Sequence, residues 1–409
     1  MGMAPGDDRI RRYYLFRAVT SFALWMPFWT LWIFKNVDNL FLLTVVDTAF
    51  WVTMIAFQLP AGLLGDKYGR KAVLFVGEVI YAVGILAFGL SDQFWMLLVS
   101  NMVWALGVCF VISGDTPFLY DTLAEVKRQG EFITISAKAF TVIAIMQGLA
   151  CIVGGVLVEL TNRFDLTLII SAIVGLGGCG TIVFLKEPKV DRSQFGSYAK
   201  HLKVGLRHVV NSRAIMVLIM FQIVVEIAVY VMAVFRSVYM TDVLNLSFLA
   251  IGLFFAAFIL FGGFVSFQAG KFEQRFGEKR SLLFMLLAIV GSFLLVFLIQ
   301  SPIVIGVQFL VYMVSYLQSP IISGYINKRV DSPHRSTVVA TSTLLFTVFL
   351  VLIELPAGWF ASTYGMTATL LVLAIGATPV GIFLLRLWNK EVDADKAEVH
   401  NHIPEKPQS

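Results

Sequence analysis

The amino-acid sequence predicts an all-α membrane protein with about twelve transmembrane helices. Of its 409 residues, 58% are hydrophobic and only 14% are charged, whereas soluble domains contain about one half apolar and about one quarter charged residues. Apolar stretches of roughly 20 residues, the length of a helix that spans a bilayer, recur along nearly the whole chain. There is no ten-residue alternation typical of a membrane barrel, so helices are the expected spanning elements.

The expected helices form two groups of six. Their approximate ranges are 13–35, 39–64, 72–91, 93–120, 132–160 and 166–186, then 213–240, 247–270, 281–300, 302–326, 336–362 and 367–388. This pattern predicts an N-terminal half at 1–186 and a C-terminal half at 213–390, joined by a polar segment at 187–212. The last residues, 391–409, are polar and are expected to form a disordered cytoplasmic tail.

The joining segment 187–212 carries apolar residues at helical spacing with basic residues between them. The apolar residues are Phe195, Tyr198, Leu202, Leu206 and Val209. This pattern predicts an amphipathic helix on the cytoplasmic interface. A disordered loop is the alternative.

Lysine and arginine residues predict the orientation of the chain. With the N-terminus inside, 26 of them fall in the inner segments and three fall outside, namely Lys35, Arg163 and Arg236. Cytoplasmic loops carry such an excess, so both termini are expected in the cytoplasm and the number of spans is expected to be even. The net charge of +5 then reflects topology and contact with anionic lipid, and no nucleic-acid partner is expected.

Three segments share a pattern of Ala-Gly, five residues, then an aromatic residue and Gly. They are Ala61-Gly62 to Tyr68-Gly69, Ala269-Gly270 to Phe276-Gly277, and Ala357-Gly358 to Tyr364-Gly365. The first two lie 208 residues apart on the expected inner side, and the third lies on the outer side. This arrangement predicts two parallel halves, each made of inverted three-helix units, unless the similarity of these glycine-rich helix ends is due to chance. A fourth copy, expected in the fifth span, is reduced to Gly154-Gly155.

The loop from Gly62 to Leu74, GLLGDKYGRKAVL, resembles the signature loop of the major facilitator superfamily, G-x-L-a-D-r-x-G-r-k-x-x-l. The one departure is Gly65 in place of the usual alanine. The resemblance implies the fold of that family, with twelve transmembrane helices in two pseudo-symmetric six-helix halves. It also implies that this loop acts as a cytoplasmic latch.

Four loop residues and one residue of the fourth span carry the expected latch. Gly62 and Gly69 permit close packing and a tight turn, and Asp66 can accept hydrogen bonds at a helix end. Arg70 can pair with a carboxylate, and Asp121 matches the acidic partner of this arginine in the family. The alternative is ordinary topogenic charge with a turn.

The corresponding C-terminal loop, 271–280, keeps the glycine and the charges but has Gln274 where Asp66 sits. Its latch role is therefore expected to be weaker.

The fifth span leaves the direction of transport open. Drug/proton antiporters of the family often carry Gly-Pro followed by Gly-Gly in this span. In this chain Gly154-Gly155 is kept, but Cys151-Ile152 stands where Gly-Pro would be.

Ionisable residues inside a membrane are costly and are functional by default. Glu226 falls about halfway along the seventh span, flanked by Gln222 and Tyr230 on one helix face, and is the first candidate for proton coupling. A structural glutamate bonded to a neighbouring helix is the alternative. Asp47 and Glu354 follow, since their spans face each other in the resembling family.

Candidate cavity residues lie on several spans. The tenth span has a polar stripe that includes Gln308, Tyr312 and Tyr316, and the first span offers Arg17 and Trp25. Gln222 belongs to the polar face of the seventh span. Together these side chains predict an aromatic, mildly polar cavity for an amphipathic or weakly cationic organic molecule.

Three further intramembrane residues are interpreted with less specific roles. Asp115 either lines the inner vestibule or pairs with Arg17 or Lys138. Glu78 is interpreted as structural. Pro27 is expected to kink the first span, because proline removes a helical hydrogen bond.

The predicted function is secondary active transport by alternating access, as proton-coupled efflux of a small organic compound through a monomeric antiporter in the inner (plasma) membrane. Nutrient uptake by symport and a non-transporting membrane receptor are the alternatives.

An enzyme is not expected, because GxSxG, HExxH and P-loop motifs are absent from the sequence. Cys109, Cys151 and Cys179 lack ligand spacing, so no metal or cofactor is expected.

Overall fold

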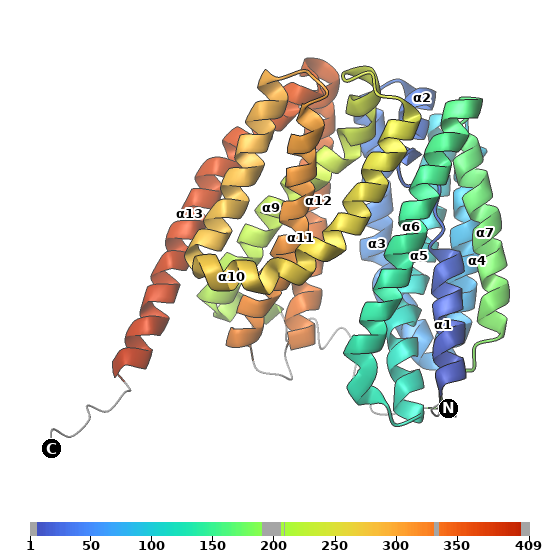
Figure 1. Ribbon diagram of the computed structural model, residues 1–409, viewed down its shortest axis with the longest axis horizontal. Helices are drawn as coiled ribbons and strands as arrows, with labels where there is room; N and C mark the ends of the chain where they lie inside the picture. Colours follow the sequence, from blue (N-terminus) through green and yellow to red (C-terminus); the bar gives the residue numbers. More distant parts are fainter. Residues whose placement is uncertain (1–5, 190–205, 208, 331–334, 402–409) are drawn as a thin grey trace. The chain divides into compact units, whose positions relative to one another are not determined.

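A computed structural model describes residues 6–189, 206–207, 209–330 and 335–401. The described residues form helices and no strand (Figure 1). The α-helices are α1 (Asp7–Thr20), α2 (Trp29–Val37), α3 (Leu40–Tyr68), α4 (Arg70–Gly89), α5 (Phe94–Glu125), α6 (Phe132–Thr161), α7 (Asp165–Val183), α9 (Arg213–Asp242), α10 (Phe248–Leu298), α11 (Val304–Arg329), α12 (Arg335–Tyr364) and α13 (Met366–Asn401), and one 3-10 turn, η1, covers Gln129–Glu131.

Within the described residues, ten helices are long and apolar enough to cross a membrane. One of them, α10, has 51 residues and contains a kink at Gly277, so it supplies two passes. The short helices α1 and α2 together supply one more. The expected twelve-helix, all-α membrane fold is therefore confirmed.

The first expected span, 13–35, is broken into α1 and α2 by a non-helical stretch at 21–28. Pro27 lies in this stretch, has no backbone N–H and cannot continue the hydrogen-bond ladder. The backbone N–H of Leu24 instead donates to Ser171 Oγ of α7 at 2.9 Å. A neighbouring helix thus satisfies a backbone group that the break sets free, as a chain in hydrocarbon requires.

The joining segment and the C-terminal tail are described only in part. Phe195, Tyr198 and Leu202 lie outside the described residues, so the amphipathic helix at 187–212 stays a prediction. Helix α13 extends beyond the boundary near residue 388 and ends at Asn401.

All four copies of the internal repeat end on a residue with positive φ. Gly69, Gly277 and Gly365 have φ of 106°, 73° and 93°. The degraded copy in α6 keeps the same spacing, because five residues separate Gly154-Gly155 from Thr161-Asn162. Asn162 has φ 52°, and asparagine is among the few side chains that tolerate this region. The feature that all four copies share is therefore a turn with positive φ. A search for glycine alone finds only three of the four copies.

The chain divides into two compact units. Unit 1 contains Met1–Lys200, Ala233–Gly263 and Leu350–Met366, and unit 2 contains His201–Met232, Phe264–Phe349 and Thr367–Ser409. In unit 1, helices α4 and α5 approach closely through glycine. A Cβ atom on Gly84 would meet the Trp104 backbone, and one on Gly107 would meet the Tyr81 backbone. Small residues allow this close helix packing where no hydrophobic effect drives it.

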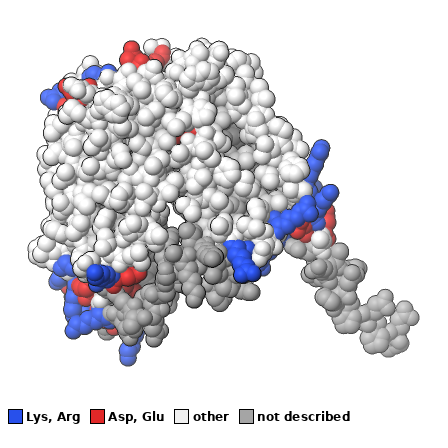
Figure 2. Space-filling model, turned by 180° about the vertical axis from the view of Figure 1, so that it is seen from behind, with Lys and Arg blue, Asp and Glu red and all other residues white. Residues whose placement is uncertain are grey.

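Charged side chains gather at the ends of the helices, and much of the surface between them is free of charge on the face that Figure 2 shows. The helix ends that carry Arg70, Arg128, Lys279 and Arg329 are here called the basic ends. Arg236 differs from its expected place in an outer loop, since it is buried in α9 with its guanidinium 3.9 Å from the ring centroid of Phe255. An aromatic face offers a buried cation a favourable electrostatic surface.

The turn at Gly277 can be tested by replacing it with alanine. We expect Gly277→Ala to lower the free energy of unfolding by about 1–2 kcal/mol, because alanine at positive φ is strained. No atom lies within 4 Å of a Cβ built at this position among the described residues, so crowding does not contribute. The measurement is denaturant unfolding of the detergent-solubilised protein.

Gly291→Ala is the matched control for this test. Gly291 lies inside helix α10, with no described atom within 4 Å of an added Cβ and no positive φ. We expect this variant to be as stable as the parent or more stable, since alanine favours a helix interior. Equal destabilisation by both substitutions would contradict the assigned turn.

Candidate functional site

The loop between α3 and α4 forms a charged cluster at the basic end of unit 1. Arg70 Nη2 lies 2.6 Å from Asp66 Oδ1, and Arg70 Nε lies 3.8 Å from Asp121 Oδ2. The side chains of Arg70 and Asp121 are only 9% and 8% exposed. The structure therefore brings together the three charged residues of the expected latch, with Gly69 supplying the turn between them.

Glu187 is an additional member of this cluster that the sequence does not reveal. Its carboxylate accepts hydrogen bonds from the backbone N–H groups of Arg70 at 2.8 Å and Lys71 at 2.7 Å. The Lys71 ammonium in turn donates to the carbonyls of Val183 and Leu185. Glu187 thus caps helix α4, whose first turn holds no acidic residue of its own.

A second tie at the basic end joins α1 to the turn after α5. Arg128 lies 2.8 Å from Asp7 and 2.6 Å from Glu131. These two carboxylates, Glu131 first, raise the pKa of Arg128, so the guanidinium stays charged.

A cavity of about 280 Å³ lies inside unit 1. Its lining comes from the first span and from α4, α5 and α6, and consists of Arg17, Thr20, Ser21, Ala23, Trp25, Met26, Glu78, Tyr81, Val108, Val111 and Gln147. Arg17 and Trp25, two of the candidate cavity residues, are among them. The break at 21–28 matters for this cavity, because it supplies Trp25 and Met26 from a non-helical stretch.

The charges around the cavity are balanced by specific partners. Arg17 Nη1 lies 3.5 Å from Asp115 Oδ2, and the Tyr13 hydroxyl donates to Asp115 Oδ1 at 2.8 Å. Lys138, the other partner considered for Asp115, is exposed. Glu78 is buried in α4 and lines the cavity, although its place on a peripheral helix favoured a structural role.

Asp47 and Glu354 meet in a buried cluster of unit 1. Glu354 of α12 and Asp47 of α3 are both buried there and lie close enough to interact electrostatically. The Thr48 hydroxyl donates to Glu354 Oε2 at 3.0 Å, and all three side chains are buried. Two carboxyl groups that share a buried site cannot both ionise without strong repulsion. The structure thus brings these two candidate residues together.

Glu226 lies in a separate polar network in unit 2. Gln222 Nε2 donates to Glu226 Oε1 at 2.9 Å, and Gln318 Nε2 donates to the Gln222 carbonyl at 2.9 Å. Ser342 Oγ lies 3.5 Å from Gln222 Oε1. Glu226 is thus bonded to a residue of the polar helix face that the sequence predicts, and α11 and α12 join the network through Gln318 and Ser342.

The polar stripe of α11 belongs to unit 2. Gln308 and Tyr312 are buried within unit 2, and Tyr316 is partly buried. The sequence-predicted cavity residues therefore fall into two groups, with Arg17, Trp25 and Asp115 in unit 1 and Gln222, Gln308, Tyr312 and Tyr316 in unit 2.

Helix capping by Glu187 can be measured by replacing this residue with glutamine. We expect Glu187→Gln to lower the free energy of unfolding by about 0.5–2 kcal/mol, because two N–H groups of α4 lose an ionised acceptor. Thermal unfolding in detergent is a suitable measurement. Glu391→Gln, which removes the charge from a partner of the exposed Arg213, is expected to change stability by less than about 0.5 kcal/mol. A larger loss in the control than in Glu187→Gln would contradict the capping role.

The chain is similar to proteins whose names refer to drug resistance. The chain is 26% identical to Multidrug resistance protein 1 of Bacillus subtilis over 160 residues, which are 39% of each protein. It is 22% identical to Quinolone resistance protein NorA of Staphylococcus aureus over 287 residues, covering 70% of this chain and 72% of NorA.

Two solved structures share the fold. The nucleoside transporter NupG superposes with a TM-score of 0.75 at 12% identity, covering 93% of this chain and 99% of NupG. A bacterial homologue of the human lysosomal transporter Spinster, in an inward-facing and occupied conformation, gives a TM-score of 0.77 at 13% identity, covering 94% of this chain and 97% of that protein. The family profile named Major Facilitator Superfamily matches residues 14–340, and the chain belongs to this superfamily of membrane transporters.

Proposed function

We propose that this protein exports small, amphipathic, weakly cationic organic compounds in exchange for protons, by alternating access. The observation that carries the proposal is the buried pair of Asp47 and Glu354, two carboxyl groups that cannot both ionise at this site without strong repulsion. A transporter coupled to protons requires a group that binds and releases one within the membrane.

The unit 1 cavity supports the proposed substrate class. Trp25 and Tyr81 offer aromatic surface, Met26 offers an adaptable apolar surface, and Glu78 offers a carboxylate. An aromatic wall with a carboxylate favours an organic cation over an anion. Arg17 is already paired with Asp115, so the cavity does not present this arginine as a free anion receptor.

Similarity to drug-resistance proteins supports the direction of transport. Multidrug resistance protein 1 and NorA carry resistance in their names, and removal of a compound from the cell is one way to confer resistance. The excess of lysine and arginine at the basic ends supports placing these ends and both termini in the cytoplasm, with the protein in the plasma membrane. The proposed working form is a monomer of two six-helix halves joined by residues 187–212.

Proton coupling can be tested with proteoliposomes and a fluorescent organic cation. We expect the protein to accumulate the cation when the vesicle lumen is more acidic than the medium. Glu354→Gln is expected to reduce this response to the level of protein-free vesicles, because an amide cannot release a proton. Glu226→Gln is expected to keep the response.

Other outcomes of this measurement assign the coupling differently. Loss of the response in Glu226→Gln but not in Glu354→Gln would move the coupling site to the unit 2 network. An unmodified protein that responds to no pH gradient of either sign would exclude coupled export.

The latch can be tested through Asp66. We expect Asp66→Asn to slow transport about tenfold, equivalent to roughly 1.4 kcal/mol, through the loss of a charged hydrogen-bond acceptor for Arg70. The amount of protein inserted in the membrane should not change. Asp8→Asn is the control, because Asp8 also pairs with an arginine four residues away at 2.8 Å but is exposed. Equal transport by Asp66→Asn and the unmodified protein would rule out the latch.

A further inference from the structure

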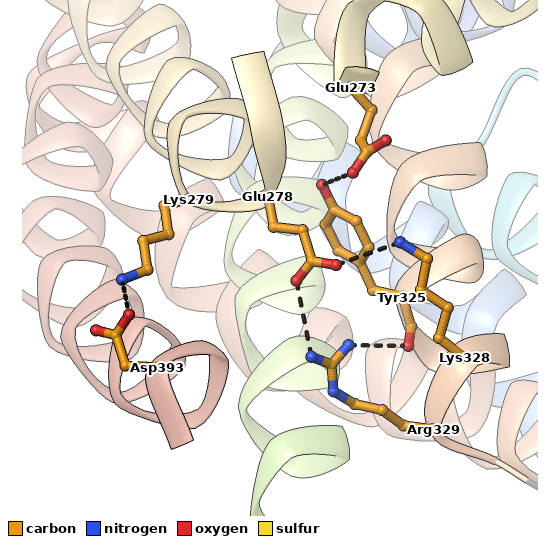
Figure 3. Close-up of polar contacts among 7 residues, drawn as sticks. All are labelled: Glu273, Glu278, Lys279, Tyr325, Lys328, Arg329 and Asp393. Carbon is orange, nitrogen blue, oxygen red and sulfur yellow. Dashed lines mark hydrogen bonds and ion pairs between the residues drawn. The ribbon is translucent and has the colours of Figure 1, made fainter. Parts of the chain in front are cut away.

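The basic end of unit 2 contains an ion pair whose sequence positions repeat those of the latch. Arg329 Nη2 lies 3.7 Å from Glu278 Oε2, and the two side chains are 16% and 19% exposed (Figure 3). Glu278 follows Arg70 by 208 positions, and Arg329 follows Asp121 by the same 208 positions. This is also the offset between the first two copies of the glycine repeat, so the two ion pairs occupy equivalent places.

The charges of the second pair are reversed. Unit 1 has the cation Arg70 after the turn glycine and the anion Asp121 near the end of α5. Unit 2 has the anion Glu278 after Gly277 and the cation Arg329 at the end of α11. The reversal also explains Gln274, which stands where Asp66 sits. A carboxylate at position 274 would lie four residues before Glu278, and like charges at this spacing repel.

The reversed polarity agrees with the helix dipoles. Acidic residues are favoured at the start of a helix and basic residues at its end. Glu278 begins the part of α10 that follows the turn at Gly277, and Arg329 is the last residue of α11. In the first unit, Arg70 begins α4 and Asp121 lies in the last turns of α5, so both charges oppose the dipoles and Glu187 supplies the missing anion at α4.

The surroundings of Arg329 fix it further. Its guanidinium lies 4.5 Å from the ring centroid of Trp388, and its Nη1 donates to the Tyr325 carbonyl at 3.4 Å. The rings of Tyr325 and Trp388 stack with centroids 5.9 Å apart, and both are buried. Helices α10, α11 and α13 thus meet at this one cation, and Lys279 adds a 2.6 Å ion pair to Asp393 of α13 (Figure 3).

We infer that Glu278 and Arg329 are positioning residues that hold the end of α11 and the kink of α10 together as a brace throughout the transport cycle. The brace is the charge-reversed counterpart of the Arg70–Asp121 pair. The charges of the brace agree with the helix dipoles, which keeps the brace closed. The charges of the Arg70–Asp121 pair oppose the dipoles, which makes that pair easier to open. The effect on transport rests on the proposed function, whereas the pairing itself does not.

The test compares single charge reversals with the double reversal in the full-length protein in lipid nanodiscs. The variants are Glu278→Arg, Arg329→Glu and the two together, and the first readout is hydrogen exchange of the backbone amides at 278–285. We expect each single variant to exchange about tenfold faster, because like charges replace the pair. The double variant should recover most of this loss but exchange about two- to fivefold faster than the parent, because its charges oppose the dipoles.

Transport of the fluorescent cation is the second readout. The single reversals are expected to lower the maximal rate and leave KM unchanged, and the double reversal is expected to restore most of the rate. Lys328→Gln is the control, because Lys328 also contacts Glu278 at 3.3 Å but is 60% exposed. We expect exchange in this variant to change less than about twofold.

Several outcomes would overturn the inference. A double variant that exchanges as fast as the single variants would exclude the pairing, and one identical to the parent would exclude the role of polarity. If the single reversals fail to fold, Glu278→Asp and Arg329→Lys replace them, and unchanged exchange in both would also contradict the brace. A parent protein that transports nothing while the exchange pattern holds would refute the proposed function but not the brace.

Discussion

The structure depends on one constraint, that a chain in hydrocarbon must satisfy its backbone hydrogen bonds within its own helices or against a neighbouring helix. The chain can therefore reverse direction only where a helix ends, and such turns favour residues that tolerate positive φ. Gly69, Gly277, Gly365 and Asn162 occupy the same place in four copies of one pattern. Where the chain departs from a helix inside the first span, Ser171 supplies the acceptor for Leu24.

The same constraint applies to buried charge, which is tolerated only with a partner. Asp115 has Arg17 and Tyr13, Glu354 has Asp47 and Thr48, and Arg236 lies against phenylalanine rings. Such clusters contribute little net stability, because desolvation offsets much of the attraction. Their presence is easier to explain by function than by folding, and all three lie in unit 1.

Most of the fold could be predicted from the sequence, because hydropathy depends on composition over some twenty residues. The Arg70 cluster could be predicted because its members follow a spaced motif. The role of Glu187 could not, since its contact with α4 joins residues more than 110 positions apart. The place of Glu78 on the cavity wall could not be predicted, because hydropathy does not report which side chains reach a cavity. The Glu278–Arg329 pair can be found in the sequence by adding the repeat offset of 208 residues to the positions of Arg70 and Asp121. A comparison of residue identities misses the pair, because its charges are reversed.

The copies of the repeat differ in how tightly their glycine residues pack against neighbouring residues. At the basic ends, no described atom lies within 4 Å of a Cβ added to Gly62 or Gly270. In the inverted copies, by contrast, Gly358 is pressed against Thr44, and Gly155 lies against Phe248. Glu159 holds the place in its copy that Asp66 holds in the first, and it accepts a hydrogen bond from the Leu249 N–H at the start of α10 at 3.2 Å. Asp66 and Glu159 both lie four positions after the second small residue of their copies. Asp66 pairs with Arg70, whereas Glu159 caps α10, because the two copies have different neighbours.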